Sequence, residues 1–188
     1  MRQSQLRTLW VGLVYDSVML LSLIGLGYFK FVPISWLGAV LLLGAHVCLV
    51  EPLYYLLHRL YHTPLGIRYL HQDHHASVVT QPETAVSFFL LERLIYTVIF
   101  IPPLLLVSAM GYLSLGIAVG YILVIDSINI WGHFNVGTIP KWWHKSIFKY
   151  LLYSPQYHSV HHRNSKRNFS LFMPLWDVVF GTAHWESS

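Results

Sequence analysis

The sequence predicts an all-α integral membrane protein organised as a four-helix bundle. Hydrophobic residues make up 55% of its 188 residues and charged residues only 11%, well below the roughly 25% that soluble domains carry. Four apolar runs, each close to the ~20 residues that a membrane-spanning helix needs, are separated by short turn-forming segments. Composition and run length together favour a membrane bundle over a soluble domain.

The first two predicted spans are residues 10–29 and 36–57, with a turn around Pro33 between them. The first run is longer than the ~7–15 apolar residues of a signal peptide, and no small-residue cleavage site follows it. We therefore expect a retained membrane helix at this position.

The third and fourth predicted spans are residues 85–108 and 112–131. The third is expected to bend at Pro102–Pro103, because proline removes a helical hydrogen bond. In the fourth, Gly116 and Gly120 have the small-xxx-small spacing that lets membrane helices approach closely, which predicts a packing face there.

Four spans return the polypeptide to its starting side, so residues 58–84 and 132–188 are expected to form a helical cap on one face of the membrane. Eleven of the twelve Lys and Arg residues lie on or next to that face, and Lys30 is the exception. The positive-inside rule makes this face cytoplasmic. We expect residues 1–188 to form a single domain.

Charge and cysteine content exclude two other classes of protein. The net charge of +4 comes from residues that flank the apolar runs, which is typical of orientation signals and not of a nucleic-acid footprint. Cys48 is the only cysteine, so neither a disulfide framework nor a thiolate metal site is possible.

Three histidine boxes, HRLYH, HQDHH and HSVHH, hold eight of the twelve histidines. The eight are His58, His62, His71, His74, His75, His158, His161 and His162. Side chains three and four apart share a helix face, so each box is predicted to aim its imidazoles in one direction. Imidazole binds iron, zinc, copper or nickel, and eight ligands exceed the needs of one four-coordinate ion. The sequence therefore predicts a two-metal site on the cap, in preference to scattered surface histidines.

The other four histidines are predicted to differ in role. His133, at the end of the fourth span, is a candidate ninth ligand. His46 lies inside the second span and is expected to be a hydrogen-bonded interior histidine. His144 and His184 have Trp and Tyr neighbours, as in the aromatic belt of a membrane interface.

Charged residues inside apolar segments are functional candidates. Glu51 lies seven residues before His58, and Asp126 lies seven before His133 with Asn129 between them. These side chains could orient ligand imidazoles through their second ring nitrogen, or they could pair with arginines or water at the interface; the sequence leaves both possibilities open. Asp16 has no role that the sequence suggests.

With these boxes in place, the protein resembles the fatty acid hydroxylase / sterol desaturase superfamily of membrane di-iron enzymes over residues 49–185. The pattern of a first box, HxxHH, a single histidine after a span and a second HxxHH carries the resemblance, together with the closing NFSLFMPLWDVVFGT. Within the superfamily it is most similar to the catalytic half of plant wax aldehyde decarbonylases, which carry a further C-terminal domain. Many members have a second histidine at the position of Asn129.

The resemblance implies an enzyme that uses two iron ions and O₂ to hydroxylate, desaturate or deformylate a fatty acyl, fatty aldehyde or sterol substrate. It names no catalytic residue beyond the nine histidines, and zinc is a possible occupant in purified protein. Electrons would come from a cytochrome b5-like or ferredoxin-like donor in trans, because no nucleotide-binding glycine motif is present. The expected location is the endoplasmic reticulum in a eukaryote and the inner membrane in a bacterium.

Two alternatives from other classes remain at this stage. A zinc or copper transporter would place its ligands near the middle of the membrane, where only His46 lies. A catalytically silent family member would bind metal without turning over a substrate.

Overall fold

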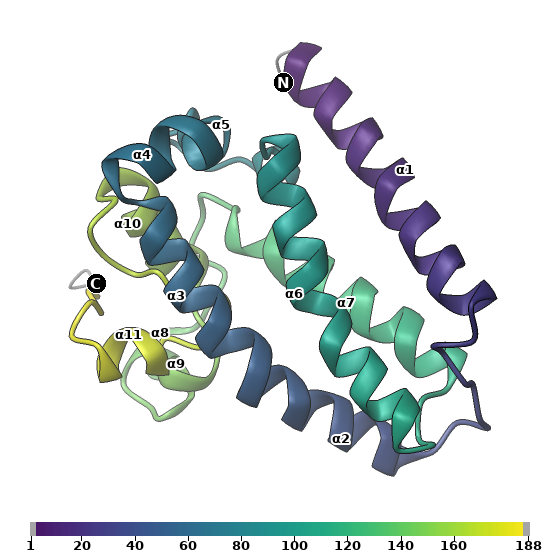
Figure 1. Cartoon of the computed structure of the whole chain (residues 1–188). Helices are drawn as coiled ribbons and strands as arrows, with labels where there is room; N and C mark the ends of the chain where they lie inside the picture. Colours follow the sequence, from purple (N-terminus) through teal and green to yellow (C-terminus); the bar gives the residue numbers. More distant parts are fainter. Residues whose placement is uncertain (1–2, 186–188) are drawn as a thin grey trace.

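The computed structural model describes residues 3–185, and all regular structure within that range is helical. This confirms the all-α fold class. Five helices are the longest (Figure 1): α1 (Gln3–Gly25), α2 (Trp36–Ala45), α3 (Glu51–Tyr61), α6 (Leu90–Ala109) and α7 (Leu115–Gly132).

Within residues 3–185, three helical stretches are long and apolar enough to cross a membrane: Trp36–Tyr61, Leu90–Ala109 and Leu115–Gly132. The first consists of α2 and α3 joined by a π-helical turn at His46–Val50, and together they form one rod in Figure 1. The apolar part of α1, Trp10–Gly25, is shorter, so the span predicted at residues 10–29 is not among the three. The four-span bundle stays a prediction.

Polar side chains hold α1 against α6. The Arg93 guanidinium donates to Asp16 Oδ2 from Nη2 at 2.6 Å and from Nε at 3.1 Å, and Thr97 donates to Asp16 Oδ1 at 2.6 Å. Gly12, one turn before Asp16, leaves the room that Arg93 needs, since a Cβ there would lie 2.0 Å from Arg93 Cδ. This contact gives Asp16 the structural role that the sequence did not suggest.

The third predicted span begins later than expected. The segment Pro82–Val86 forms a 3₁₀ turn, and Phe89 is extended, so α6 starts only at Leu90. Pro102 and Pro103 both lie inside α6.

The predicted glycine packing face on α7 is wrong for this protein. A Cβ on Gly120 would meet nothing within 4 Å, and one on Gly116 would meet only the Ile34 side chain at 3.6 Å. Close approach occurs instead at Gly38, where a Cβ would lie 2.2 Å from the Tyr112 carbonyl oxygen.

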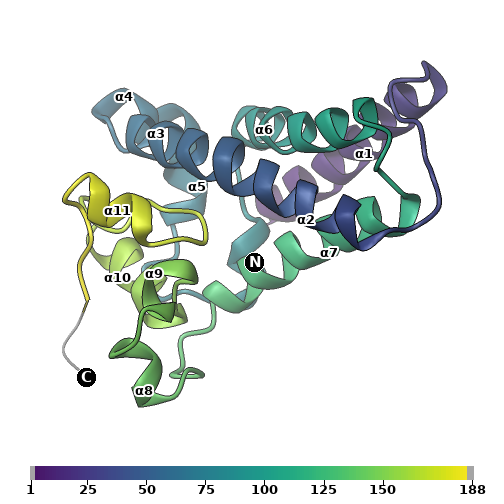
Figure 2. The same ribbon diagram turned by 90° about the horizontal axis from the view of Figure 1, so that it is seen from below.

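The remaining helices are short. They are α4 (Pro64–Gly66), a π-turn (Ile67–His71), α5 (Gln72–His75), α8 (Lys141–His144), α9 (Phe148–Leu151), α10 (Pro155–Arg163) and α11 (Leu175–Val179). Helices α8 to α11 gather on one side of the molecule, away from α1 and α6 (Figure 2). The Ser154 hydroxyl caps α10 by accepting from the Tyr157 N–H, and Pro155 occupies its first turn, a combination that favours helix initiation.

Most of the buried apolar residues within 3–185 belong to two core clusters. One includes Leu42, Leu104 and Val107, near the turns that join α1 to α2 and α6 to α7. The other includes Tyr54, Tyr96 and Phe172 and lies beside the histidines. Aromatic side chains of the long helices therefore pack against the histidines.

We predict that Gly38→Ala destabilises the protein by about 1–3 kcal/mol. The atom in the way is a backbone oxygen, and the loop that carries it is tied by the Val32 N–H to the Leu113 carbonyl at 2.9 Å, so it cannot swing aside as a side chain would. The measurement is the midpoint of thermal unfolding in detergent. The control is Gly44→Ala in the same helix, where a Cβ meets nothing within 4 Å. An equal midpoint for both variants would contradict the close approach.

Candidate metal centre

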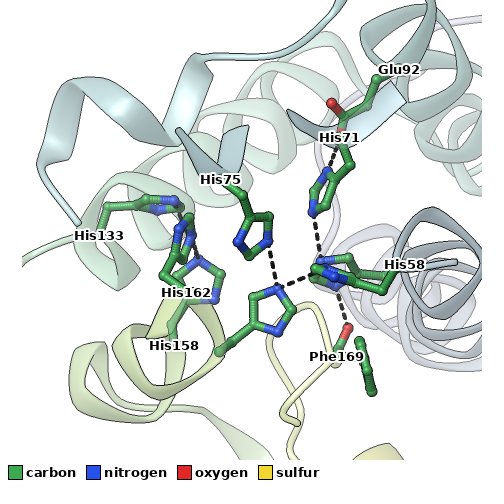
Figure 3. A network of polar contacts seen from close by, with 10 residues as sticks. His58, His71, His75, Glu92, His133, His158, His162 and Phe169 are labelled. Carbon is green, nitrogen blue, oxygen red and sulfur yellow. Dashed lines mark hydrogen bonds and ion pairs between the residues drawn. The ribbon is translucent and has the colours of Figure 1, made fainter. Parts of the chain in front are cut away.

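The structure brings all nine candidate histidines together, in two adjacent groups that could each bind a metal ion. The five-histidine cluster is His58, His62, His71, His75 and His161. The four-histidine cluster is His74, His133, His158 and His162. Within each cluster the potential ligand atoms lie within 4.8 Å of one another, and the labelled imidazoles face one another in Figure 3.

The prediction that each box aims its imidazoles in one direction is confirmed for the first box, whose His58 and His62 share the five-histidine cluster, and is wrong for the two HxxHH boxes. His71 and His75 face the five-histidine cluster, whereas His74 between them faces the other. On α10, His161 faces the five-histidine cluster, whereas its neighbour His162 faces the four-histidine cluster. Consecutive residues on a helix point about 100° apart, so the paired histidines of an HxxHH box diverge toward two different centres.

In the five-histidine cluster the Nε2 atoms converge. Nε2 of His161 lies 3.1 Å from Nε2 of His62 and 3.0 Å from Nε2 of His75. The Nε2 atoms of His58 and His71 lie 3.0 Å apart. Two nitrogens that each bind one ion at about 2.0–2.1 Å are about 2.9–3.4 Å apart in octahedral or tetrahedral geometry, so these spacings fit a shared ion.

The four-histidine cluster has the same spacing. Nε2 of His158 lies 3.3 Å from Nε2 of His133 and 3.2 Å from Nε2 of His162. The His74 ring closes the group, with its centroid 4.8 Å from that of His162 and 5.1 Å from that of His133. His133, which follows α7 and belongs to no box, is thus part of this cluster.

Backbone carbonyls fix the orientation of four imidazoles through Nδ1. His58 donates to Phe169 O at 2.7 Å, His161 to Arg167 O at 2.7 Å, His133 to Asn129 O at 2.9 Å and His162 to Ser77 O at 3.2 Å. A carbonyl oxygen can only accept, so each of these neutral rings carries its proton on Nδ1. Its Nε2 is left bare and points into a cluster.

Bare nitrogens at these distances indicate a cation site. In the four-histidine cluster, Nε2 of His133 and of His162 both carry lone pairs, and His158 between them can supply at most one proton. Such an arrangement is repulsive without a positive ion among the three rings. The all-nitrogen donor set suits iron, zinc, copper or nickel.

Burial keeps these histidines neutral. It lowers the pKa of His133 and of His161 to about 4 in each case, against hydrogen bonds to Asn129 and Arg167 that act to raise it. Burial, followed by the nearby His161, lowers the pKa of His62 to about 3. Protons therefore do not compete with a metal ion near neutral pH.

Glu92 is a candidate supporting residue of the site that the sequence reasoning missed. Its side chain is fully buried, and Oε1 lies 2.5 Å from His71 Nδ1. A carboxylate behind a ligand histidine fixes the ring and raises its basicity. The signal was present, because Glu92 is a charge at the start of an apolar span, but the pairing is visible only in the fold.

Glu51 and Asp126, the two acids considered for this role, do not bond to a cluster histidine. Glu51 lies 3.4 Å from His46 Nε2, and His46 Nδ1 lies 2.9 Å from the Tyr121 hydroxyl. His46 is thus a hydrogen-bonded interior histidine, as predicted. Asp126 lines a groove between α1, α6 and α7.

Two buried carboxylates hold the non-helical segment 167–173, which supplies the carbonyls to His161 and His58. Asp177 accepts from the backbone N–H groups of residues 169–170 at 2.7 and 2.9 Å. Glu51 accepts from those of residues 172–173 at 3.3 and 3.2 Å. Both carboxylates are completely buried, so the segment is clamped at both ends.

Known proteins are similar in sequence to the region that contains this site. The fatty acid hydroxylase family matches residues 42–182. Very-long-chain aldehyde decarbonylase GL1-6 of Oryza sativa subsp. indica is 43% identical over 148 residues, which is 77% of this chain and 23% of the relative. Protein CER1-like 1 of Arabidopsis thaliana is 42% identical over 152 residues, again 77% of this chain and 23% of the relative.

A third relative is very-long-chain aldehyde decarbonylase GL1-1 of Oryza sativa subsp. japonica, with 39% identity over 139 residues, or 73% of this chain and 22% of the relative. The protein thus spans about a quarter of the length of the curated relatives it matches. No solved structure matches it at a significant level.

We predict that Glu92→Leu weakens metal binding at the five-histidine cluster by about 10–100-fold, since it removes the acceptor that orients His71. Glu92→Gln keeps a carbonyl acceptor and should lose less. Chelator titration with metal analysis gives the affinity of each site. Equal affinities for the leucine variant and the unaltered protein would show that Glu92 does not position His71.

We predict that the metal-free protein loses stability as the pH falls from about 6.5 toward 4. An unfolded histidine has a pKa of about 6.5, whereas His133 and His161 have a pKa of about 4 when folded. The unfolded state therefore takes up protons first, and each such residue costs on the order of 1–3 kcal/mol across this window. Thermal unfolding against pH after chelation measures the effect. A flat profile would contradict the burial of these rings.

Proposed function

Since this chain belongs to the fatty acid hydroxylase family, we propose that it is a membrane-bound oxidoreductase that uses two iron ions and O₂ to hydroxylate, desaturate or deformylate a lipid. The observation that carries this proposal is the pair of adjacent histidine clusters at one end of the apolar helices. The His75 and His162 rings stack across the boundary, with centroids 4.5 Å apart, so the two centres are neighbours.

The proposed metal set follows from the donor atoms. Nine imidazoles without a carboxylate ligand leave the charge of bound iron uncompensated, and such iron would supply O₂ activation and oxidation of a C–H bond. The protein holds the rings: the four Nδ1–carbonyl bonds and Glu92 keep Nε2 directed inward. Seven of the nine histidines are buried, which excludes water that would divert the oxidant.

The apolar surroundings of the clusters support our proposal of a lipid substrate. Apolar helices lie beside them, and the two rice relatives described above are very-long-chain aldehyde decarbonylases by name. A fatty aldehyde, fatty acyl or sterol substrate is therefore our proposal for this protein. Access from the bilayer would bring the substrate to the clusters without crossing the aqueous phase.

An electron donor in trans is also part of the proposal. Residues 163–167, which run from the last residue of α10 into the loop that follows it, are exposed and include three basic residues, and the carbonyl of Arg167 accepts from His161. An electron donor with an acidic surface could dock on these basic residues. It would then lie close to His162, which directly precedes Arg163 in the sequence. The positive-inside argument gives this face as cytoplasmic, in the endoplasmic reticulum of a eukaryote or the inner membrane of a bacterium.

Metal transport is less well supported. The histidine that a transporter would need in mid-membrane is His46, which is engaged by Tyr121 and Glu51 and belongs to neither cluster. The ligand clusters instead involve the ends of α3 and α7 and the short helices beyond them.

We predict that cells expressing the protein acquire an oxidised or shortened lipid product and that His161→Ala abolishes it. His161 contacts two other cluster histidines through Nε2, so its loss should cost at least about 10²-fold in product formation. The measurements are lipid profiling with and without O₂ and iron analysis of purified protein, with about two irons per chain expected.

The matched control is His184→Ala, since His184 is exposed and lies in neither cluster. Its lipid profile should equal that of the unaltered protein. Identical profiles for the unaltered protein and the His161 variant would instead support a catalytically silent metal protein.

A further inference from the structure

The segment that follows α7 turns back onto the end of that helix. The Trp131 indole N–H donates to the Thr138 hydroxyl at 2.9 Å, and the Tyr153 hydroxyl donates to the Ile128 carbonyl at 3.1 Å. Ile128 and Trp131 lie near the end of α7, one of the helices apolar enough to cross a membrane. Residues 139–152, which we call the α8–α9 hairpin, are therefore held at both ends at the level where this candidate span meets water.

Aromatic packing gives the α8–α9 hairpin a fixed shape. The Phe148 ring on α9 stacks on Trp143 of α8 at 5.3 Å, and the Trp143 indole N–H donates to the Leu152 carbonyl at 3.4 Å. Large apolar side chains nevertheless stay 44–69% exposed in this hairpin: Trp142, Ile147, Phe148 and Leu151. So many exposed apolar groups on one short segment are unfavourable in water and indicate a contact surface.

The α8–α9 hairpin is also basic. It contains Lys141, Lys145 and Lys149 and no acidic residue. Lys141 and Lys145 are exposed, whereas the Lys149 ammonium lies over the Trp185 ring at 4.7 Å. Lysines beside exposed aromatic and aliphatic side chains are typical of segments that lie in a membrane interface and contact anionic lipids.

Helix α11 has an exposed apolar side at a similar level. It exposes Val178 and Val179, and Phe180, directly after it, stacks on Tyr55 at 4.8 Å. Tyr55 belongs to the apolar stretch Trp36–Tyr61, about 9 Å before its end. Helices α8, α9 and α11 lie on the same side of the molecule in both views (Figures 1 and 2), so the exposed apolar surface extends beyond the hairpin.

We infer that the α8–α9 hairpin is an interfacial membrane anchor that binds anionic phospholipids. Lys141 and Lys145 contact the head groups, and Ile147 and Leu151 insert among the acyl chains. The bilayer is the partner because it offers both kinds of contact at the level where the hairpin is held. An acidic electron donor would match the lysines but would leave the exposed apolar side chains without an apolar partner.

Anchoring the hairpin has a consequence for the metal centre. The hairpin leads through Tyr153 into Ser154, which caps α10, the helix that carries His158, His161 and His162. A membrane contact on the hairpin therefore fixes the position of these histidines relative to the bilayer. The inference rests on the membrane setting of the apolar helices and not on the proposed reaction.

The first test measures the depth of the hairpin in the bilayer. A nitroxide is attached at Ile147→Cys in the whole chain, after Cys48→Ala removes its only cysteine, and the protein is placed in nanodiscs of phosphatidylcholine and phosphatidylglycerol. The label should collide more with O₂, which concentrates in the bilayer, than with a water-soluble nickel chelate. Ser165→Cys, in the exposed loop after α10, is the comparison and should show the opposite preference. A preference for the nickel chelate at both positions would overturn the inference.

The second test measures lipid selectivity. The protein is released from nanodiscs that contain equal amounts of the two lipids, and the retained lipids are counted by native mass spectrometry. Lys145→Gln should lower the ratio of retained phosphatidylglycerol to phosphatidylcholine about fivefold, and adding Lys141→Gln should lower it by a similar factor. Lys166→Gln removes an exposed lysine outside the hairpin and should leave the ratio unchanged. Equal ratios in all variants would refute binding of anionic head groups.

Addition of cytochrome b5, an acidic carrier protein, separates the bilayer from an electron donor as the partner. The nitroxide at residue 147 should respond to lipid alone. A label that stays in water in the nanodisc and is covered only by the carrier would assign the hairpin to the donor and overturn the inference. Neither measurement needs metal or turnover, so a His161→Ala protein without lipid product should give the same depth and the same lipid ratio.

Discussion

The direction of each imidazole ring is the constraint on which the two clusters depend. An unsupported histidine side chain rotates about two bonds, and nine of them would not converge on two points. The protein removes this freedom by giving the outer ring nitrogen a fixed acceptor, a backbone carbonyl for His58, His133, His161 and His162 and a carboxylate for His71. Because the acceptor decides which nitrogen holds the proton, it also decides which nitrogen can bind a metal.

The register between α3 and the segment 167–173 shows how these acceptors are themselves positioned. Glu51 and His58 lie seven residues apart on one face of α3, about 10.5 Å along the helix. They contact residues 172–173 and Phe169, three to four residues apart in the non-helical segment. One helix face therefore holds one stretch of non-helical backbone at two points. Asp177 then closes the clamp from the C-terminal side.

Much of the site could be predicted from the sequence, because the candidate ligands are recognisable from their spacing within short segments. The boxes reveal eight histidines by spacing alone, and His133 follows from its place at the end of an apolar run. The supporting residues could not be predicted in the same way, since Glu92 reaches His71 across 21 positions and a carbonyl acceptor leaves no mark on residue identity. The sequence predicts that Glu51 shares a face of α3 with His58, but its partners are His46 and backbone groups more than 100 residues away.

The separation of each HxxHH box between two centres has a consequence for folding. Helix α10 supplies His161 to one cluster and His158 and His162 to the other, and the turn that carries His71, His74 and His75 divides likewise. Neither ion can therefore be held by one folded element, and each would link segments that lie far apart in the sequence. Ions that bind only the assembled state stabilise it in proportion to the logarithm of their concentration over Kd. Metal binding would then favour docking of the C-terminal helices onto α3, and the carboxylates of Glu51 and Asp177 hold segment 167–173 in place for it.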